Sequence, residues 1–263
     1  MANLLSAVGI LCTKIIGGDY LIKRVLTIDT DVIIGEDLSV YNNLIKMSSR
    51  EKIWEEVYNL HPELKGNIKP DNIMIKRLLT FVEKTLAINP NVKINVTRNH
   101  DGVLTLLEPD IREGTKFSLI NMDNHHDIWY SDSQFVETIK GRGGLANWVG
   151  YLYSQGVLED YIWLKALRSP ATIPDNFTGT CIITPVHKTL RNPIQNLDYL
   201  NLCWSPEWLP EELDWVFFKL KELIDKHLGY ETEIDETLYN PDDKLKPLDI
   251  KHKPYSYGCK VIG

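Results

Sequence analysis

The residues best suited to chemistry lie in segment 121–127, which reads Asn-Met-Asp-Asn-His-His-Asp and follows the apolar run 117–120. Asp123, His125 and Asp127 occupy alternating positions, and alternation in an extended chain points their side chains the same way. Carboxylates with one or two imidazoles suit a divalent ion, with manganese, iron or zinc ahead of calcium. A polar loop that is merely rich in His and Asp is the alternative, but the spacing is demanding. The segment therefore predicts a metal site.

Two other apolar runs end in residues of the same kind. Asp29 and Asp31 follow the run 24–28 with a spacing of two, and His100 follows the run 92–97. Taken singly, the aspartates could cap a loop and the histidine could lie on the surface. Combined with segment 121–127, they suffice for two divalent ions with a bridging carboxylate and a bridging water. Two cations about 3.5–4 Å apart would bring the pKa of that water near neutrality.

The elements that must position these residues alternate along the chain. Hydrophobic spacing predicts strands at 24–28, 92–97, 117–123, 161–164, 181–184 and 199–204, and helices at 53–60, 71–86, 146–155 and 210–227. The first apolar run resumes at 32–34, and a short helical turn is expected at 103–107. The alternation predicts an α/β fold, a three-layer αβα arrangement with a mainly parallel sheet. In such sheets, sites form beyond the carboxyl ends of the strands.

Length and composition favour one domain. At 263 residues, with 43% hydrophobic and 25% charged residues, the chain is typical of a soluble globular protein. We expect a single α/β domain over 1–230. Residues 231–263 are polar and proline-rich, which predicts an irregular C-terminal extension packed on the domain or on a neighbouring subunit. The sequence leaves a homo-oligomer open.

The net charge and the cysteine content limit the classes of partner and the cellular compartment that we expect for this protein. The net charge of −7 and the lack of a dense Lys/Arg cluster argue against nucleic acid. Four widely spaced cysteines without a Cys-x-x-Cys pair indicate a reduced, intracellular set. The apolar opening lacks a basic leader, and no stretch approaches membrane-spanning length. We expect a cytoplasmic protein without a membrane or nucleic-acid partner.

Together the motifs resemble those of the ureohydrolase superfamily, which includes arginase, agmatinase and related binuclear-manganese enzymes and shares its fold with histone deacetylases. That family takes its ligands from a Gly-Gly-Asp-His, an Asp-x-His-x-Asp and an Asp-x-Asp strand end. The resemblance covers these motif segments over roughly residues 23–208. It implies an arginase/deacetylase-like sheet, two Mn²⁺ per chain, and the ligands His100, Asp123, His125, Asp127, Asp29 and Asp31.

This chain departs from the family pattern at two places. The Asp-x-Asp strand normally follows the Asp-x-His-x-Asp strand, whereas here Asp29 and Asp31 come first. Either the chain is circularly permuted relative to the common arrangement, or these two aspartates are not ligands. The strand end at His100 also lacks the glycines. The assignment of segment 121–127 depends on neither point.

The resemblance also implies a reaction and a substrate. The Ser-Pro-Glu-Trp segment 205–208 and the Asn-Trp pair after the Gly-rich turn 143–146 are most similar to a divergent branch that includes peptide arginases. Those enzymes turn arginine side chains of ribosomally made peptides into ornithine. Glu207 falls where the family places the acidic residue that holds the guanidinium. The expected substrate is an arginine-containing peptide or a small guanidino compound, with urea as the second product.

Other candidates surround the cluster. Trp129 and Tyr130, in the loop after it, could stack on a cationic side chain, and Asn147 is a further candidate substrate contact. His126 and His187 are candidate proton donors to the leaving amine. His126 alternates away from the ligand face, which favours a packed role for that residue.

Two readings from other classes stay open. Segment 26–31 resembles the first motif of haloacid-dehalogenase-like phosphatases, with Asp29 as nucleophile and Asp31 as acid/base. Those enzymes also need a later lysine and an acidic pair at strand ends, and the sequence offers no convincing set. The second reading is a non-catalytic protein that keeps the fold and a metal.

Overall fold

The part of the chain that carries the predicted site is described almost continuously. The computed structural model describes residues 21–34, 49–65, 68, 72–141, 144, 146–167, 169, 171–238 and 260–261. Most of the predicted C-terminal extension lies outside this set. The described part of this extension, residues 231–238, runs beside the edge of the sheet, where Asp235 forms a single parallel bridge with Thr97.

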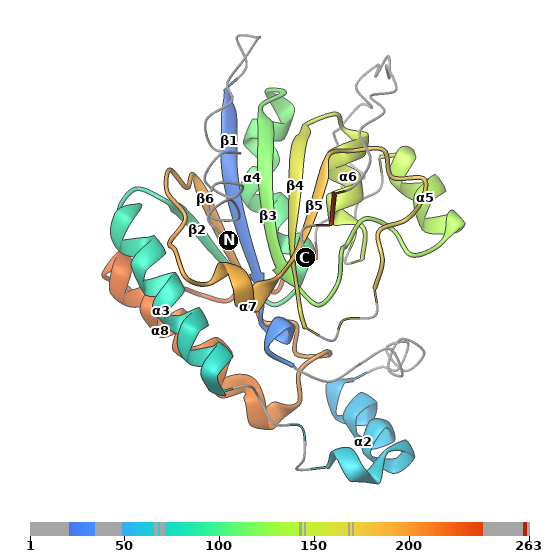
Figure 1. Ribbon diagram of the computed structural model, residues 1–263, viewed down its shortest axis with the longest axis vertical. Coiled ribbons are helices and arrows are strands. Elements are labelled where there is room, and N and C mark those ends of the chain that lie inside the picture. The colour runs from blue at the N-terminus through green and yellow to red at the C-terminus, as the bar shows by residue number, and fades with distance from the viewer. Residues whose placement is uncertain are drawn as a thin grey trace.

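One parallel sheet of seven strands organises the described residues (Figure 1). The spatial order is β2-β6-β1-β3-β4-β5-β7, and every described pairing is parallel. The strands are β1 (Ile22–Asp29), β2 (Lys93–Thr97), β3 (Lys116–Asp123), β4 (Leu158–Lys165), β5 (Cys181–Pro185), β6 (Tyr199–Cys203) and β7 (Lys260–Val261).

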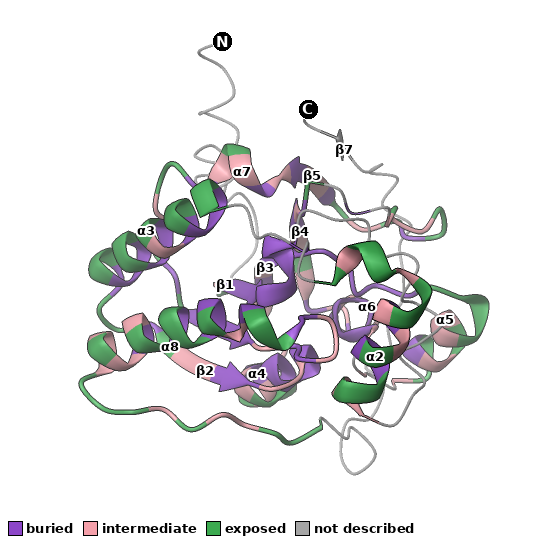
Figure 2. Ribbon diagram, turned by 90° about the horizontal axis from the view of Figure 1, so that it is seen from below, coloured by how far each residue is buried: buried purple, intermediate pink, exposed green. Residues whose placement is uncertain are grey.

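Helices cover both faces of the sheet, which confirms the predicted three-layer α/β architecture. Helices α3 and α8 pack on one face and α4 and α6 on the other. The outer sides of α3, α4 and α8 are exposed, whereas α6 is mostly buried (Figure 2). The α-helices are α2 (Arg50–Leu60), α3 (Asn72–Ile88), α4 (Val103–Arg112), α5 (Asp132–Ile139), α6 (Trp148–Ser154), α7 (Val186–Thr189) and α8 (Asp214–Leu228). Short 3-10 turns are η1 (Thr30–Ile33), η3 (Pro62–Leu64), η4 (His100–Gly102) and η5 (Glu211–Leu213).

Alternation along the strands builds two separate cores. In β1, Leu26 and Ile28 enter the core beneath α3 and α8, whereas Val25 enters the core beneath α4 and α6. β3 divides in the same way, with Met122 on the first side and Leu119 on the second. Each such side chain contributes roughly 1.5–3 kcal/mol on burial. Both faces of the sheet are therefore covered, as a parallel sheet requires.

Two predicted elements differ from those observed, and one helix was not predicted. The run 32–34 does not extend the first strand, because the Asp29 carboxylate accepts from the Asp31 amide and turns the chain into η1. The unpredicted helix is α5; it is short and begins at Asp132, after the N-cap Ser131, whose hydroxyl accepts from the Gln134 amide. The last predicted helix begins at Asp214 rather than at 210, because the intervening residues form η5.

The strand order brings the predicted site residues to one place. β1 lies at the centre of the sheet, between β6 and β3. Ile28 pairs with Met122, and Asp29 pairs with Cys203, so Asp29 and Asp123 end neighbouring strands at the same edge. β2, which leads to His100, lies on the far side of β6. Separately, none of the helices in the described ranges is long and apolar enough to cross a membrane.

Candidate metal centre

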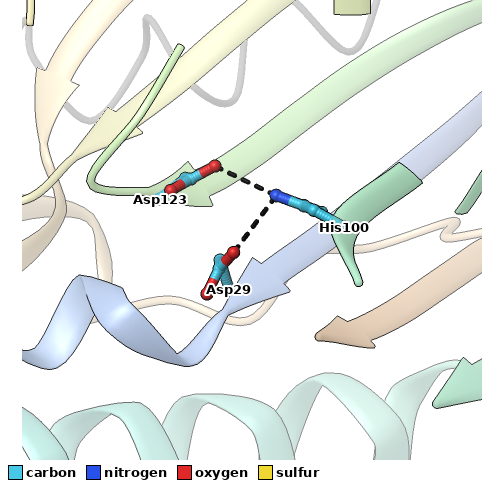
Figure 3. Close-up of side chains that lie close together, drawn as sticks. All are labelled: Asp29, His100 and Asp123. Atoms are coloured by element: carbon cyan, nitrogen blue, oxygen red, sulfur yellow. Dashed lines mark ion pairs between the residues drawn. The ribbon is translucent and has the colours of Figure 1, made fainter. Parts of the chain in front are cut away.

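The first half of the cluster gathers around His100. Figure 3 shows Asp29 and Asp123 at the ends of β1 and β3, both facing the His100 ring from η4. His100 Nδ1 lies 3.4 Å from Asp29 Oδ2, 3.0 Å from Asp123 Oδ2 and 3.0 Å from Asp127 Oδ2. Two strand ends and the loop after β3 therefore meet at one imidazole nitrogen.

The second half gathers around His125 and shares a carboxylate with the first. His125 Nδ1 lies 3.0 Å from Asp31 Oδ2 and 3.5 Å from Asp123 Oδ1. The ligand atoms of Asp31, Asp123 and His125 lie within 4.8 Å of one another, as do those of Asp29, His100 and Asp123. Asp123 thus turns Oδ2 toward one half and Oδ1 toward the other.

Local backbone geometry presents these groups. Turn η1 brings Asp31 back to the strand ends, where its Oδ1 accepts from the Asn124 amide at 3.2 Å. Asp127 has a left-handed backbone with φ of 49°, a conformation that non-glycine residues seldom adopt. The Val149 amide at the start of α6 donates to the Asp127 carbonyl at 2.9 Å and holds the loop in this shape. The predicted ligand set is therefore assembled in full.

The donor set fits a cation. Among the described residues, both ring nitrogens of His100 and Oδ2 of Asp31 are buried without a hydrogen-bond partner. His100 Nδ1 nevertheless lies 3.0 Å from two carboxylate oxygens, so the short distances lack hydrogen-bond geometry. Buried polar atoms are ordinarily satisfied. Lone pairs that point to one place without a hydrogen-bond partner can be satisfied by a shared ion. The cluster could therefore hold a metal ion.

Burial and neighbouring charges shift the pKa values of the carboxylates in the cluster. Burial, followed by repulsion from Asp31 and Asp123, raises the pKa of Asp29 well above its ordinary value. Burial and then Asp123 raise the pKa of Asp127 to about 6. Burial also opposes the charge on Asp123, but His100 and His125 outweigh it and hold its pKa well below the ordinary value. A bound cation would stabilise buried carboxylates whose charges repel one another.

The histidines carry the compensating charge in the metal-free protein. Burial lowers the pKa of His100, but Asp123 and Asp127 outweigh burial and raise it well above its ordinary value. Asp31 and Asp123 do the same for His125. Four carboxylates face two imidazoles, so the groups that can carry negative charge outnumber those that can carry positive charge. A divalent ion would replace the extra protons on these imidazoles, since a ligating histidine must be neutral.

Three supporting residues were not identified from the sequence. The Ser205 hydroxyl donates to Asp29 Oδ2 at 2.5 Å, and the Trp148 indole donates to Asp127 Oδ2 at 2.7 Å. The Asn121 amide lies 3.3 Å from Asp123 Oδ2. Asn121 could have been found, because it precedes Asp123 by two and shares its face of β3. Ser205 and Trp148 depend on tertiary contacts that no local spacing reports.

Glu207 lies beside the cluster but already has a charged partner. Its Oε1 accepts from the Arg98 guanidinium at 2.7 Å, and both side chains are 29% exposed. The neighbouring residues touch the cluster on either side: Ser205 bonds to Asp29, and the Trp208 ring centroid lies 4.3 Å from that of His125. The loop is thus fixed against both halves of the centre.

The two aromatic candidates have different environments. Trp129 is 3% exposed, packs against Phe135 and Phe177, and donates through its indole to Asn176. Its position is that of a core residue rather than a substrate contact. The Tyr130 ring is 45% exposed, although its hydroxyl is fixed by the amides of His126 and Asp127. Of the pair, Tyr130 is the one available to a ligand.

The remaining candidates have their described contacts elsewhere. His126 Nδ1 accepts from the Ile128 amide, its ring stacks on Tyr130, and burial lowers its pKa to about 3. His187 lies on α7 after β5, with Nδ1 buried. Asn147 donates to the Thr138 hydroxyl and so ties α6 to α5.

Solvent reaches the cluster from one side. The His125 side chain is 17% exposed, whereas the side chains of the other five ligands range from 0% to 6%. The Trp208 ring lies against His125 on this side.

Comparisons of the chain with models of protein families, with curated proteins and with solved structures find no match.

Proposed function

We propose that the protein is a binuclear manganese hydrolase of the ureohydrolase type, which converts an arginine residue of a peptide into ornithine and releases urea. The observation that carries this proposal is the shared carboxylate of Asp123. Its two oxygens belong to two overlapping ligand groups, one with Asp29 and His100 and one with Asp31 and His125. A carboxylate between two such groups is what a pair of bridged ions requires.

The donor types support manganese. Four carboxylates and two imidazoles form an oxygen-rich set, which suits Mn²⁺ better than thiolate-seeking ions. When bound, the ions supply Lewis acidity that activates water near neutral pH. His100, Asp29 and Asp127 would hold one ion, His125 and Asp31 the other, and Asp123 both. The central position of β1, which puts Asp29 beside Asp123, supports the circularly permuted form of the family resemblance.

The proposed reaction needs one residue that binds the guanidinium and another that supplies a proton to the leaving nitrogen. Water adds to the guanidinium carbon, the bond from that carbon to the side-chain nitrogen breaks, and the nitrogen leaves as the ammonium group of ornithine with urea as co-product. Glu207 would pair with the guanidinium through charge-assisted hydrogen bonds, as it already does with Arg98. The leaving nitrogen needs a proton, and His126, with a pKa of about 3, is neutral and packed. His187 is the better candidate for this transfer.

A phosphatase is the weaker alternative. A phosphatase of the haloacid-dehalogenase type needs Asp29 free to attack phosphorus, whereas Asp29 Oδ2 accepts from the Ser205 hydroxyl and lies 3.4 Å from His100 Nδ1. The two imidazoles against the carboxylates of the cluster further favour a metal centre. The peptide substrate rests on the family resemblance and on the exposed ring of Tyr130 beside the cluster.

The test combines metal content with product analysis. The purified protein is reconstituted with manganese, and elemental analysis should find about two ions per chain. Asp123→Ala should lose both metal and activity. Asp160→Ala, which alters a half-buried β4 carboxylate bonded to Ser118 outside the cluster, is the control and should keep both.

Urea release and ornithine are then measured on an arginine-containing peptide, on free arginine and on agmatine. Activity on the peptide is expected to be highest. Activity confined to the small compounds would overturn the peptide substrate and leave the hydrolase standing. Bound metal without activity on any of the three would favour a non-catalytic metal protein. No bound metal would overturn the proposal.

A further inference from the structure

We propose that Trp148 is a positioning residue for the His100 half of the metal centre, where its indole holds the Asp127 carboxylate and the His100 ring in the orientation that an ion needs. The inference rests on the proposed metal binding, but not on the reaction or its substrate.

The hydrogen bond is the first support. Trp148 Nε1 donates to Asp127 Oδ2 at 2.7 Å, and this is the oxygen that lies 3.0 Å from His100 Nδ1. Trp148 is fully buried and Asp127 is 4% exposed. A hydrogen bond to a carboxylate in such a medium is short and strong. It occupies one side of the oxygen and directs the remaining lone pair toward the cluster.

The ring contact is the second support. The ring centroids of Trp148 and His100 lie 4.9 Å apart at an interplanar angle of 49°. One side chain therefore touches two of the ligands of the same half, one through its N–H and one through its ring. Phenylalanine could provide the second contact but not the first.

The backbone fixes Trp148 in this place. It is the first residue of α6, and the next two amides, of Val149 and Gly150, both donate to the Asp127 carbonyl. A Cβ at Gly150 would lie 2.2 Å from the Ile128 carbonyl, so only glycine allows the helix to come this close. Side chain and main chain thus attach the same loop residue to the same helix end.

The alternative is that Trp148 only fills the core. Its neighbour Asn147, predicted as a substrate contact, faces the other way and bonds to Thr138. A purely structural tryptophan would affect folding without a specific effect on one metal site. The two roles can be separated, because metal affinity and stability are measured independently.

The experiment is a calorimetric titration of metal-free protein with Mn²⁺, with thermal unfolding of the same samples. In Trp148→Phe, affinity at one of the two sites should fall about ten- to a hundredfold, the usual effect of removing a group that orients a ligand. Trp129→Phe is the matched control: it removes an indole bond of equal length, 2.7 Å, to Asn176 in the same core. Its manganese affinities should stay unchanged.

A double-mutant cycle identifies the path of the effect. If Trp148 acts through Asp127, Trp148→Phe should weaken manganese binding little further in an Asp127→Asn background. Should Trp148→Phe not fold, benzothienylalanine at this position keeps the bicyclic shape without the N–H and gives the same comparison. Unchanged affinity in the variant that folds, or full additivity with Asp127→Asn, would overturn the inference. Absence of manganese binding by the parent would overturn the metal proposal itself.

Discussion

Replacing Asp29 with Asn should stabilise the metal-free protein and weaken its stabilisation by metal. In the metal-free protein, Asp29 faces two like charges, Asp31 and Asp123, and one opposite charge, His100. The ligand atoms of Asp29 and Asp123 lie within 4.8 Å of each other. At an effective dielectric constant of about 20, one unit pair at this range is worth roughly 3.5 kcal/mol. One uncompensated repulsion of this size, added to the burial cost, makes the charge unfavourable.

The metal-free Asp29→Asn variant should therefore be the more stable protein, by up to about 3 kcal/mol at pH 7. That corresponds to a rise in Tm of roughly 5–10 °C for a chain of this size. The sign depends on pH. The pKa of Asp29 is raised above 3.8 on folding, so its charge costs stability above the raised pKa and costs nothing below 3.8. The advantage of Asn should vanish as the pH falls toward that value.

Manganese should remove most of this advantage, because it stabilises the parent more than the variant. At a free concentration a hundred times its Kd, an ion stabilises the parent by about 2.7 kcal/mol. A variant with hundredfold weaker affinity would gain only about 0.4 kcal/mol under the same conditions. Differential scanning calorimetry at pH 7, with chelator and then with manganese, measures both effects. Asp160→Asn is the control, since its response to manganese should match that of the parent. A metal-free Asp29→Asn protein less stable than the parent, or an equal response to manganese, would refute this reasoning.

Three further predictions concern the surroundings of the cluster. Glu207→Gln should lower kcat/KM on an arginine peptide about ten- to a hundredfold, because roughly 1.5–3 kcal/mol of charge-assisted binding is lost. The metal content measured by elemental analysis should stay unchanged. Kinetics like those of the parent would exclude a contact between Glu207 and the substrate. His126 is neutral on folding because burial lowers its pKa to about 3, so stability is lost as the pH falls from 6.5 toward 3. Between pH 7 and 4 the parent should lose about 3 kcal/mol more than His126→Asn in urea unfolding, and equal losses would contradict the shift. Tyr130→Phe leaves two backbone N–H groups without their acceptor and should lower the free energy of unfolding by roughly 1–3 kcal/mol. The same urea unfolding curves measure this change. An unchanged free energy would mean that water replaces the hydroxyl.

The sequence was sufficient to find the residues of the cluster. Alternation predicted that Asp123, His125 and Asp127 share one region, and they do, although the strand ends at Asp123 and the left-handed Asp127 is brought there by a bent loop and not by an extended chain. Strand ends in a parallel sheet meet at one edge, which accounts for Asp29 and His100 as well. The layered fold followed from the same periodicity, because strands and helices bury apolar residues at different spacings.

Strand order and side-chain packing could not be predicted in this way. Nothing local states that β1 lies between β6 and β3, since that depends on pairings between distant segments. Trp129 and Tyr130 are adjacent in sequence, yet one is buried in a core and the other is exposed. The bond between Trp148 and Asp127 joins positions 21 residues apart, so no local spacing reports it.

The central position of β1 has a consequence for how the molecule folds. Asp29 can receive the Ser205 hydroxyl only after β6 has docked, and the two residues are 176 positions apart in the chain. Contacts of such long range carry a large loop-closure cost and form slowly. The ion-binding site is consequently absent from any intermediate in which β1 is not yet flanked on both sides. In refolding experiments, manganese should therefore accelerate no early phase, and the appearance of tight binding should coincide with the slowest one.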